Sequence, residues 1–284
     1  MPLIRTIDPA AAPLSVAEAR NHVRQDVTTD DVLLDVYLRA AREFCQTYCR
    51  RTLVASRYKL VLDAFPGPTF ATVPGGQPYG LPAQAVLLEY GPVLSVLSIK
   101  YLDMAGTQQT LSPTAYTVDL SGLPARITPR FGQIWPVTLP QIASVEITFD
   151  AGDCAAISAT GNVVSVTGGL WKVLAVNDAV RLTNSGGALP TPLQPDTDYY
   201  VQSLPTASSF TVSATAGGAV IPLTDAGTGQ SYIGAMPEAV RAWLLLRMGS
   251  LFENREDVSI LQRGTIVSLP FMDRLLDGAV VYLN

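Results

Sequence analysis

The sequence predicts an α+β protein with a small helical bundle, an antiparallel β region and a separate all-β domain. Apolar residues recur at three- and four-residue spacing in residues 14–52 and again after Met236, which is typical of helices that bury one face. In residues 57–149, short alternating runs are separated by Pro and Gly, as in antiparallel strands. From Gly152 to Gly234 the composition shifts to Gly, Ser, Thr, Ala and Val with very few charges, which indicates a second β module.

Two helices are predicted before residue 53. Ser15 and Glu18 have the spacing of a capping box, in which a hydroxyl and a carboxylate satisfy free amides at a helix start. A second helix is expected to begin at residue 28 or 29 and to end in two arginines, which suits the helix dipole. Its predicted core face consists of Leu33, Leu34, Tyr37, Ala41, Phe44, Cys45 and Tyr48. Its predicted solvent face consists of Asp35, Arg39, Arg42, Glu43 and Gln46.

Nine short strands and a third long helix are expected in the rest of the chain. The strands are Tyr58–Leu62, Ala85–Glu89, Val96–Leu102, Ala115–Val118 and Val145–Phe149, followed in the β module by Val173–Val176, Ala179–Thr183, Tyr199–Ser203 and Phe210–Ser213. The helix begins at Pro237, because Pro suits the first helical position and Glu238 suits the first turn. Its apolar face is predicted to close the core and consists of Val240, Trp243, Leu244, Met248, Leu251 and Phe252. The terminal segment LPFMDRLLDGAVVYLN is apolar enough to need a docking surface on its own chain or on a neighbour.

The composition excludes several classes of function. The net charge of −5 and the pI of about 4.9 argue against a protein that grips nucleic acid, which needs clustered basic residues. With His22 as the single histidine and only three cysteines, we expect no metal site, no cofactor and no catalysis. Charged residues make up only 15% of the chain, so part of its surface is expected to be covered by other subunits. No membrane span or secretory signal is recognisable, so we expect folding in a cytoplasm.

Two functions other than a structural one are open at this stage. Asp196 and Asp198 would suit a glycosidase, but paired catalytic carboxylates need a cleft and a separation of about 5–9 Å, so a surface turn is the favoured interpretation. Trp171, Tyr199 and Tyr200 could stack on sugar rings in a carbohydrate-binding protein. Residues of these types serve more often in a module core or at a sheet edge.

Several segments resemble one family of virus proteins. PEAVRAWLLLRMGSLFENRED, from Pro237 to Asp257, is similar to the C-terminal helix of the head-to-tail connector (adaptor) proteins of long-tailed bacteriophages. LSVAEARNHVRQD and DDVLLDVYLRAAREFCQTYCRRTL resemble the opening helices of that family. VLSVLSIKYLDMAGTQQTLSPTAYTVD, RITPRFGQIWP, VEITFDAG and the late LPFMDRLL follow in the family's order, and the resemblance covers roughly two thirds of the chain.

The resemblance also predicts the domain boundaries. In the family, the strand that ends in a segment like Phe149–Gly152 leads after a short connection to the Pro-Glu helix. Here residues 153–235 intervene, so they are expected to be an inserted β domain in an adaptor core of residues 1–152 and 236–284. The insertion itself resembles small β repeats of phage tail and fibre proteins.

The family implies a structural function in the virion neck, with assembly in the host cytoplasm. Its members form a ring, commonly of twelve copies, that binds the capsid portal and then a head-closure (stopper) or tail protein. Genomic DNA passes through the ring without specific binding. Another neck or tail-completion protein of the same kind of particle is the alternative. The residues expected to bind partners are Glu253, Asn254, Arg255, Leu269, Pro270, Phe271, Leu275 and Leu276.

Overall fold

The computed structural model describes residues 3–67, 84–168, 173–254 and 274–281. The fold is α+β, and its strand pairs are antiparallel, in agreement with the fold class that the sequence predicts. The chain forms two compact units. The sheet unit takes its residues from Met1–Asp8, Ser56–Gly152 and Val281–Asn284, and the barrel–helix unit takes them from Pro9–Ala55 and Asp153–Val280.

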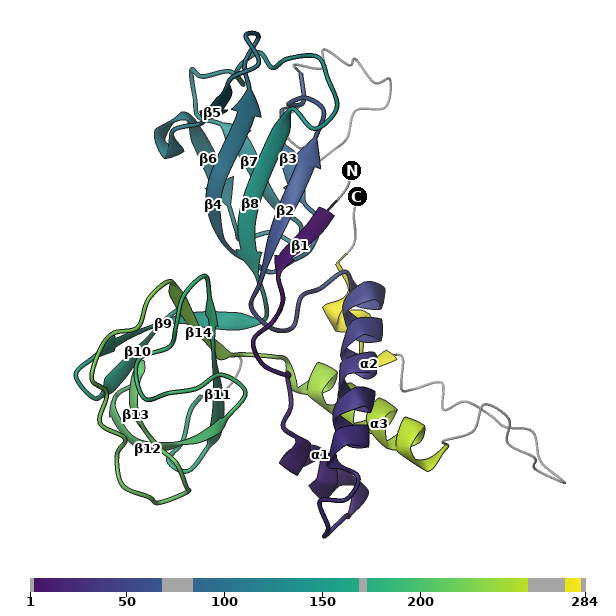
Figure 1. The fold of residues 1–284 in the computed structure, drawn as a ribbon, viewed down its shortest axis with the longest axis vertical. Helices are drawn as coiled ribbons and strands as arrows, with labels where there is room; N and C mark the ends of the chain where they lie inside the picture. The colour runs from purple at the N-terminus through teal and green to yellow at the C-terminus, as the bar shows by residue number, and fades with distance from the viewer. Residues whose placement is uncertain (1–2, 68–83, 169–172, 255–273, 282–284) are drawn as a thin grey trace, which may run out of the picture. The chain divides into compact units, whose positions relative to one another are not determined.

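The sheet unit contains two antiparallel sheets that share one core. The larger sheet has the strand order β1 (Leu3–Ile7), β2 (Ser56–Leu62), β8 (Val145–Ala151), β4 (Val93–Leu102) and β5 (Gln108–Thr110) (Figure 1). The smaller sheet has the order β3 (Val86–Leu88), β7 (Ala125–Pro129) and β6 (Tyr116–Asp119), with a short 3-10 turn, η1 (Pro113–Ala115), before β6. All five strands predicted for this region are present. The shared core includes Leu60, Leu88, Ile99, Ile127 and Ile147.

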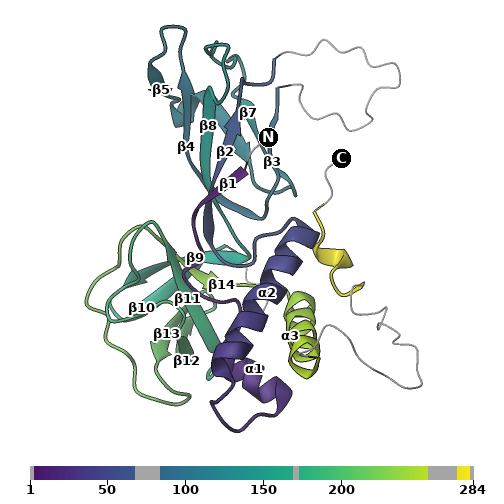
Figure 2. The same cartoon turned by 45° about the vertical axis from the view of Figure 1, so that its right-hand side comes forward.

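Three helices form the helical part of the barrel–helix unit: α1 (Val16–Val23), α2 (Asp31–Cys49) and α3 (Glu238–Glu253). Helices α2 and α3 lie side by side in both views (Figures 1 and 2). Ser15 is the N-cap of α1, and its hydroxyl accepts a hydrogen bond from the Glu18 amide at 3.0 Å, as the sequence predicts. The Glu18 carboxylate, however, accepts a hydrogen bond from Arg241. None of the described residues belongs to a helix with the length and apolarity that a bilayer crossing requires.

The core face of α2 differs in part from the predicted one. Arg42 and Gln46, predicted to face solvent, are buried, whereas Phe44 and Tyr48, predicted to face the core, are each 48% exposed. Gln46 is inside because its side-chain oxygen accepts a hydrogen bond from the Leu53 amide at 3.2 Å, just beyond the helix. The buried apolar residues of α2 are Leu34, Leu38, Ala41, Cys45 and Cys49.

The predicted apolar face of α3 is confirmed for five of its six residues. Val240, Trp243, Leu244, Met248 and Phe252 are buried in the helical core, while Leu251 is only partly buried. The C-terminal segment adds to the same core through Leu276 and through Ala279 of a short 3-10 turn, η2 (Asp277–Ala279). The described part of this segment therefore docks on its own chain, which is one of the two possibilities that its apolar sequence leaves open.

Six strands close into a barrel. Their order is β10 (Val163–Thr167), β13 (Ser209–Ser213), β12 (Asp198–Thr206), β11 (Ala179–Ser185), β14 (Gln230–Gly234) and β9 (Cys154–Thr160). The barrel has its own core, which includes Val164, Leu182, Val201, Phe210 and Val212. Three of the four strands predicted here are present. Val173–Val176 was predicted to be a strand, but it is irregular, and Val173 is 90% exposed.

The first and last strands of the barrel bring its two ends together. Cys154 of β9 pairs with Gly234 of β14, and the Ala235 amide donates a hydrogen bond to the Asp153 carbonyl oxygen at 2.8 Å. Adjacent ends are what an insertion between Gly152 and Met236 requires. The barrel also packs with the three helices into one compact unit, so its status as an inserted domain stays a prediction.

Candidate functional site

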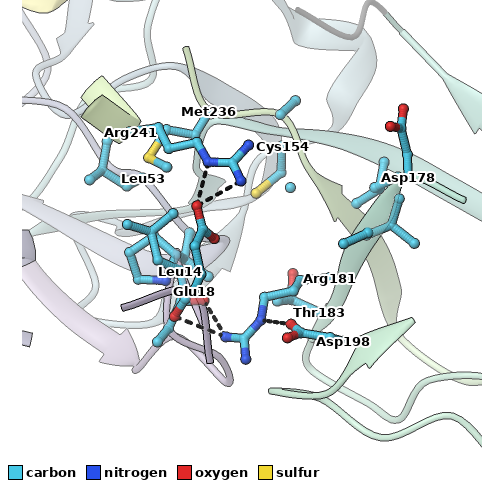
Figure 3. Close-up of a pocket in the computed structure, with 18 of the residues that line it drawn as sticks. Leu14, Glu18, Leu53, Cys154, Asp178, Arg181, Thr183, Asp198, Met236 and Arg241 are labelled. Carbon is cyan, nitrogen blue, oxygen red and sulfur yellow. Dashed lines mark hydrogen bonds and ion pairs between the residues drawn. The ribbon is translucent and has the colours of Figure 1, made fainter. Parts of the chain in front are cut away.

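A pocket lies where the barrel meets the helices of the barrel–helix unit (Figure 3). Its walls come from the segment before α1, from the start of α3 and from strands β11, β12 and β14 of the barrel. Charged side chains dominate one side, and they are engaged with one another (Figure 3). The labelled residues that matter for its chemistry are Glu18, Cys154, Arg181, Asp198 and Arg241.

Arg181 on β11 ties the barrel to the segment before α1. Its Nε donates to Asp198 Oδ1 at 2.6 Å, and its Nη1 donates to Asp196 Oδ1 at 2.8 Å and to the Ala12 carbonyl oxygen at 2.9 Å. Asp196 in turn accepts a hydrogen bond from the Ala12 amide at 2.9 Å. The two carboxylates that could have formed a glycosidase pair therefore both bind one guanidinium, and their observed contacts are structural.

Two further ion pairs join parts of the same unit. Arg241 of α3 binds the Glu18 carboxylate of α1, with its Nε 2.7 Å from Oε1. Arg51, after α2, forms a bidentate pair with Asp153 at the barrel entry, with distances of 2.6 Å (Nε to Oδ2) and 2.5 Å (Nη2 to Oδ1). Burial raises the pKa of the Asp153 carboxyl, and the Arg51 guanidinium counteracts this rise.

The three cysteines are free thiols whose surroundings shift their pKa in different directions: the contact with Cys45 lowers the pKa of Cys49, whereas the pKa values of Cys45 and Cys154 are raised. Burial raises the pKa of the Cys154 thiol to about 12, so the thiol stays protonated at neutral pH. Cys45 and Cys49 are buried on one side of α2 with their sulfur atoms 4.0 Å apart, and this contact together with burial raises the pKa of Cys45. Within the described part of the chain, no group of three or more His, Cys, Asp or Glu residues could hold a metal ion.

The residues predicted to bind partners have different environments. Glu253 and Asn254 are exposed at the end of α3, where the Asn254 amide and side chain both donate to the Ser250 carbonyl oxygen. Leu275 is half-buried against the helical core, and Leu276 is completely buried in it. The other four, Arg255, Leu269, Pro270 and Phe271, lie outside the described residues.

The aromatic residues of the barrel do not form a sugar-stacking surface among the described residues. Tyr199 is only 6% exposed, and its hydroxyl accepts a hydrogen bond from the Gln194 amide at 2.8 Å. Tyr200 is half-buried and pairs with Ala179 and Ser213 in the barrel sheet. Trp171, the third candidate, lies outside the described residues.

Exposed apolar residues follow one another along α2, beside the exposed Arg39 and Glu43. We call this surface the outer face of α2 and define it by its exposed residues at four-residue spacing, which are Val32, Val36, Ala40, Phe44 and Tyr48. Val32 is 80% exposed, and Val36 is 53% exposed. The Phe44 ring is held in place between the Tyr48 and Trp243 rings, at centroid distances of 6.2 and 5.6 Å.

A second exposed apolar surface lies in the sheet unit, on residues 130–142, which we call the apolar loop. Its exposed large side chains are Phe131, Ile134, Val137 and Ile142. Trp135 anchors the loop, because its ring stacks on Phe65 at 4.6 Å and its Nε1 donates to the Gln84 carbonyl oxygen at 2.8 Å. The Leu139 amide adds a hydrogen bond to the Leu102 carbonyl oxygen at 3.0 Å. The loop therefore presents its apolar side chains from a fixed backbone.

Comparison with known proteins finds similar folds among solved structures of gene transfer agent particles. No model of a known protein family matches the chain, and no curated protein matches it. Three solved structures contain chains of similar fold, and each comparison covers 100% of this chain and 97% of the other. They are the virion of a native gene transfer agent (GTA) particle (TM-score 0.56, 16% identity), the neck of an empty GTA particle computed with C6 symmetry (0.54, 15%) and the neck of a native GTA particle computed with C12 symmetry (0.51, 16%). At this identity, the likeness shows the fold.

Sequence reasoning missed both apolar surfaces, although each leaves a signal. Val32 and Val36 stand outside the predicted core face of α2, so the helix carries apolar residues on more than one side. The run FGQIWPVTLPQI contains no charge and many large apolar residues, which is unusual for an irregular segment at the surface.

Proposed function

We propose that this chain is a structural protein of the neck of a phage-like particle, where copies of it form a ring between the capsid portal and the tail. The observation that carries the proposal is the likeness of fold to chains of the GTA virion and neck over 100% of this chain. The order of the connector-like segments in the sequence supports the same function independently.

A ring of about twelve copies is the proposed assembly. The GTA necks of similar fold were computed with C12 and C6 symmetry. A ring needs two different contact surfaces on every subunit, because each copy meets its two neighbours through different faces. The outer face of α2 and the apolar loop provide two separate surfaces that would otherwise expose large apolar side chains to water.

The proposed partners lie above and below the ring. A portal protein would bind one side, and a head-closure or tail protein would bind the other. The exposed end of α3 with Glu253 and Asn254, together with Arg255, Leu269, Pro270, Phe271 and the half-buried Leu275, is proposed for these contacts. Leu276 acts in them by anchoring the segment on its own core. Genomic DNA would pass through the channel without specific binding, and a net charge of −5 suits a passage that must not retain phosphates.

We further propose that the protein is not an enzyme and that its barrel is an inserted domain. The Asp196–Arg181–Asp198 arrangement serves as a structural clamp, and the Cys154 thiol is not activated. The barrel is proposed to be an inserted domain, residues 153–235, in an adaptor core of residues 1–152 and 236–284. Assembly would take place in the host cytoplasm, and the mature protein would lie in the virion neck.

Removal of the gene from the particle's genome tests this function. Without the chain, DNA-filled heads should accumulate without tails, and expression of the chain in trans should restore complete particles. A reconstruction of complete particles should locate a ring of about twelve copies beneath the portal. Tailed, infectious or gene-transferring particles that lack the chain would contradict the proposal, and so would a position at the distal end of the tail.

A further inference from the structure

We propose that the outer face of α2 of one subunit docks on the apolar loop of the next subunit, and that this contact closes the ring. The inference rests on the proposed function, because it assigns the ring interface to particular residues. The occupant of each surface is therefore a second copy of this chain, and each copy uses both surfaces once.

The outer face of α2 exposes large apolar side chains beside the charged Arg39 and Glu43. The core side of α2 is already filled by Leu34, Leu38 and Cys45, so these residues account for its packing within the subunit. Val32 and Val36 lie on the other side and are exposed by 80% and 53%. Phe44 is contacted by Trp243 and Arg247 of its own chain, whereas Val32 and Val36 need a cover that the described residues do not supply.

The apolar loop suits such a cover because its shape is set before binding. Trp135 is buried and holds the middle of the loop by stacking and by a hydrogen bond. Phe131 and Ile134, which precede this anchor, are exposed by 104% and 79%, and Val137, which follows it, is exposed by 73%. A rigid loop loses little conformational entropy on binding, and aromatic side chains such as Phe131 are frequent anchors of protein interfaces.

Three features pair these two surfaces with each other. A ring contact joins two different surfaces of the same chain, and the described residues provide one in each compact unit. Each of the two gathers four exposed large apolar side chains. The outer side of α2 exposes both Arg39 and Glu43, and Glu43 is the carboxylate there that could meet Arg130 at the start of the loop. Arg130 forms no ion pair with the described residues, so its guanidinium is available to a carboxylate of a neighbour.

Two double variants separate the surfaces. The face variant combines Val32→Asp with Val36→Asp, and the loop variant combines Phe131→Asp with Ile134→Asp. Both should keep the wild-type thermal transition, because all four side chains are exposed. In light scattering, each variant should stay monomeric at concentrations about tenfold or more above those at which wild-type rings form. Val173→Asp on the barrel and Met104→Asp in the sheet unit change exposed apolar residues elsewhere, so these controls should still form rings.

Mixing identifies the contact itself. Each variant retains one intact surface, so equal amounts of the two variants should form dimers and nothing larger. Dimers would not form if the two surfaces bound different proteins. As a second measurement that does not depend on the aspartate variants, Glu43→Arg and Arg130→Glu should each weaken the ring, and the chain that carries both substitutions should recover it.

The outcomes distinguish this inference from the proposed function. Wild-type rings together with rings of both double variants would overturn the docking and leave the ring function standing. Monomeric variants that form no dimer on mixing would overturn the pairing of the two surfaces. Wild-type protein that forms no ring in solution or on portal-bearing heads would instead count against the proposed function.

Discussion

At the scale of single residues, the Arg51–Asp153 pair is the most deeply buried ion pair in the described chain. Its side chains are 5% and 0% exposed, and it links the end of α2 to the first residue before the barrel. Taking two charges out of water costs several kcal/mol, which this bidentate geometry offsets. A sequence cannot reveal the pair, because 102 residues separate the partners and Arg51 reads equally well as a basic helix end.

We predict that Asp153→Asn destabilises the protein by about 3–5 kcal/mol, because it leaves the buried guanidinium without this carboxylate. Urea unfolding followed by tryptophan fluorescence measures the loss. The matched control is Asp35→Asn, which breaks the partly exposed Asp35–Arg39 pair on α2 and should cost only about 0.5 kcal/mol. Equal losses in the two variants would contradict the structural importance of the buried pair.

A second residue-scale prediction concerns acid stability. The Ser121 hydroxyl and the Arg126 guanidinium bind the Asp119 carboxylate and lower its pKa from the ordinary 3.8 to about 2. A depressed pKa stabilises the folded state above pH 3.8, and this contribution disappears as the pH falls towards 2. Asp119→Asn should therefore lower the urea midpoint at pH 7, and its midpoint should converge with that of the wild type near pH 2. A difference that does not change with pH would contradict this assignment.

At the scale of elements, the sequence predicts where a helix lies in the chain better than it predicts which side of that helix faces the core. Apolar spacing locates α2, but spacing alone does not distinguish two apolar sides, so it places Phe44 and Tyr48 on the core face although both are half-exposed. The strands that escaped prediction are short or rich in small and polar residues, as in β14 (QSYIG) and β5 (QQT). β14 pairs with β9 and β11, which are distant in sequence, and β5 pairs with the neighbouring β4. Pairing determines such strands more than their own propensity does.

The C-terminal segment gives a prediction at this scale. Leu276 is completely buried in the helical core, so Leu276→Ala should cost about 2–5 kcal/mol through lost burial and an unfilled cavity. Arg274→Ala, an exposed neighbour, should change the stability by less than about 0.5 kcal/mol. Chemical denaturation of both variants provides the comparison. If Leu276→Ala were as stable as the wild type, the segment would be free to act on a partner alone.

At the scale of the whole molecule, a β-rich stretch between Gly152 and Gly234 was predictable from its composition, and the six barrel strands lie within it. The closed barrel was not predictable, because closure depends on the pairing of β9 with β14 across the entire module. The hydrogen bond from Arg181 to the Ala12 carbonyl oxygen could not be predicted from the sequence either, because 169 residues separate the two. The outer face of α2 and the apolar loop could not be predicted either. Whether their side chains are exposed depends on which side of each element packs against the core.

Because the two ends of the barrel are adjacent, the barrel can be deleted and its flanks joined by a short linker. We expect the stability of the remaining chain to depend on whether Asp153 is kept. A chain that joins Asp153 to Ala235 through a short Gly-Ser linker keeps the Arg51 partner, and we predict that its helices and sheet unit still fold. A chain that lacks residues 153–235 also loses that carboxylate and should be about 3–5 kcal/mol less stable than the first. Both retain Trp135 and Trp243, so fluorescence can follow their unfolding in urea.

The excised barrel completes this test. Residues 154–234 form a closed sheet with a separate core, so the fragment should unfold in one cooperative transition of its own. The remaining chain should lose some stability even with Asp153 in place, because the Arg181 hydrogen bonds to Ala12 and Leu14 disappear with the barrel. If both excised chains are insoluble and the fragment is unfolded, the barrel is an integral part of the barrel–helix unit. Cooperative unfolding of the fragment and of the longer chain would support an insertion that folds by itself.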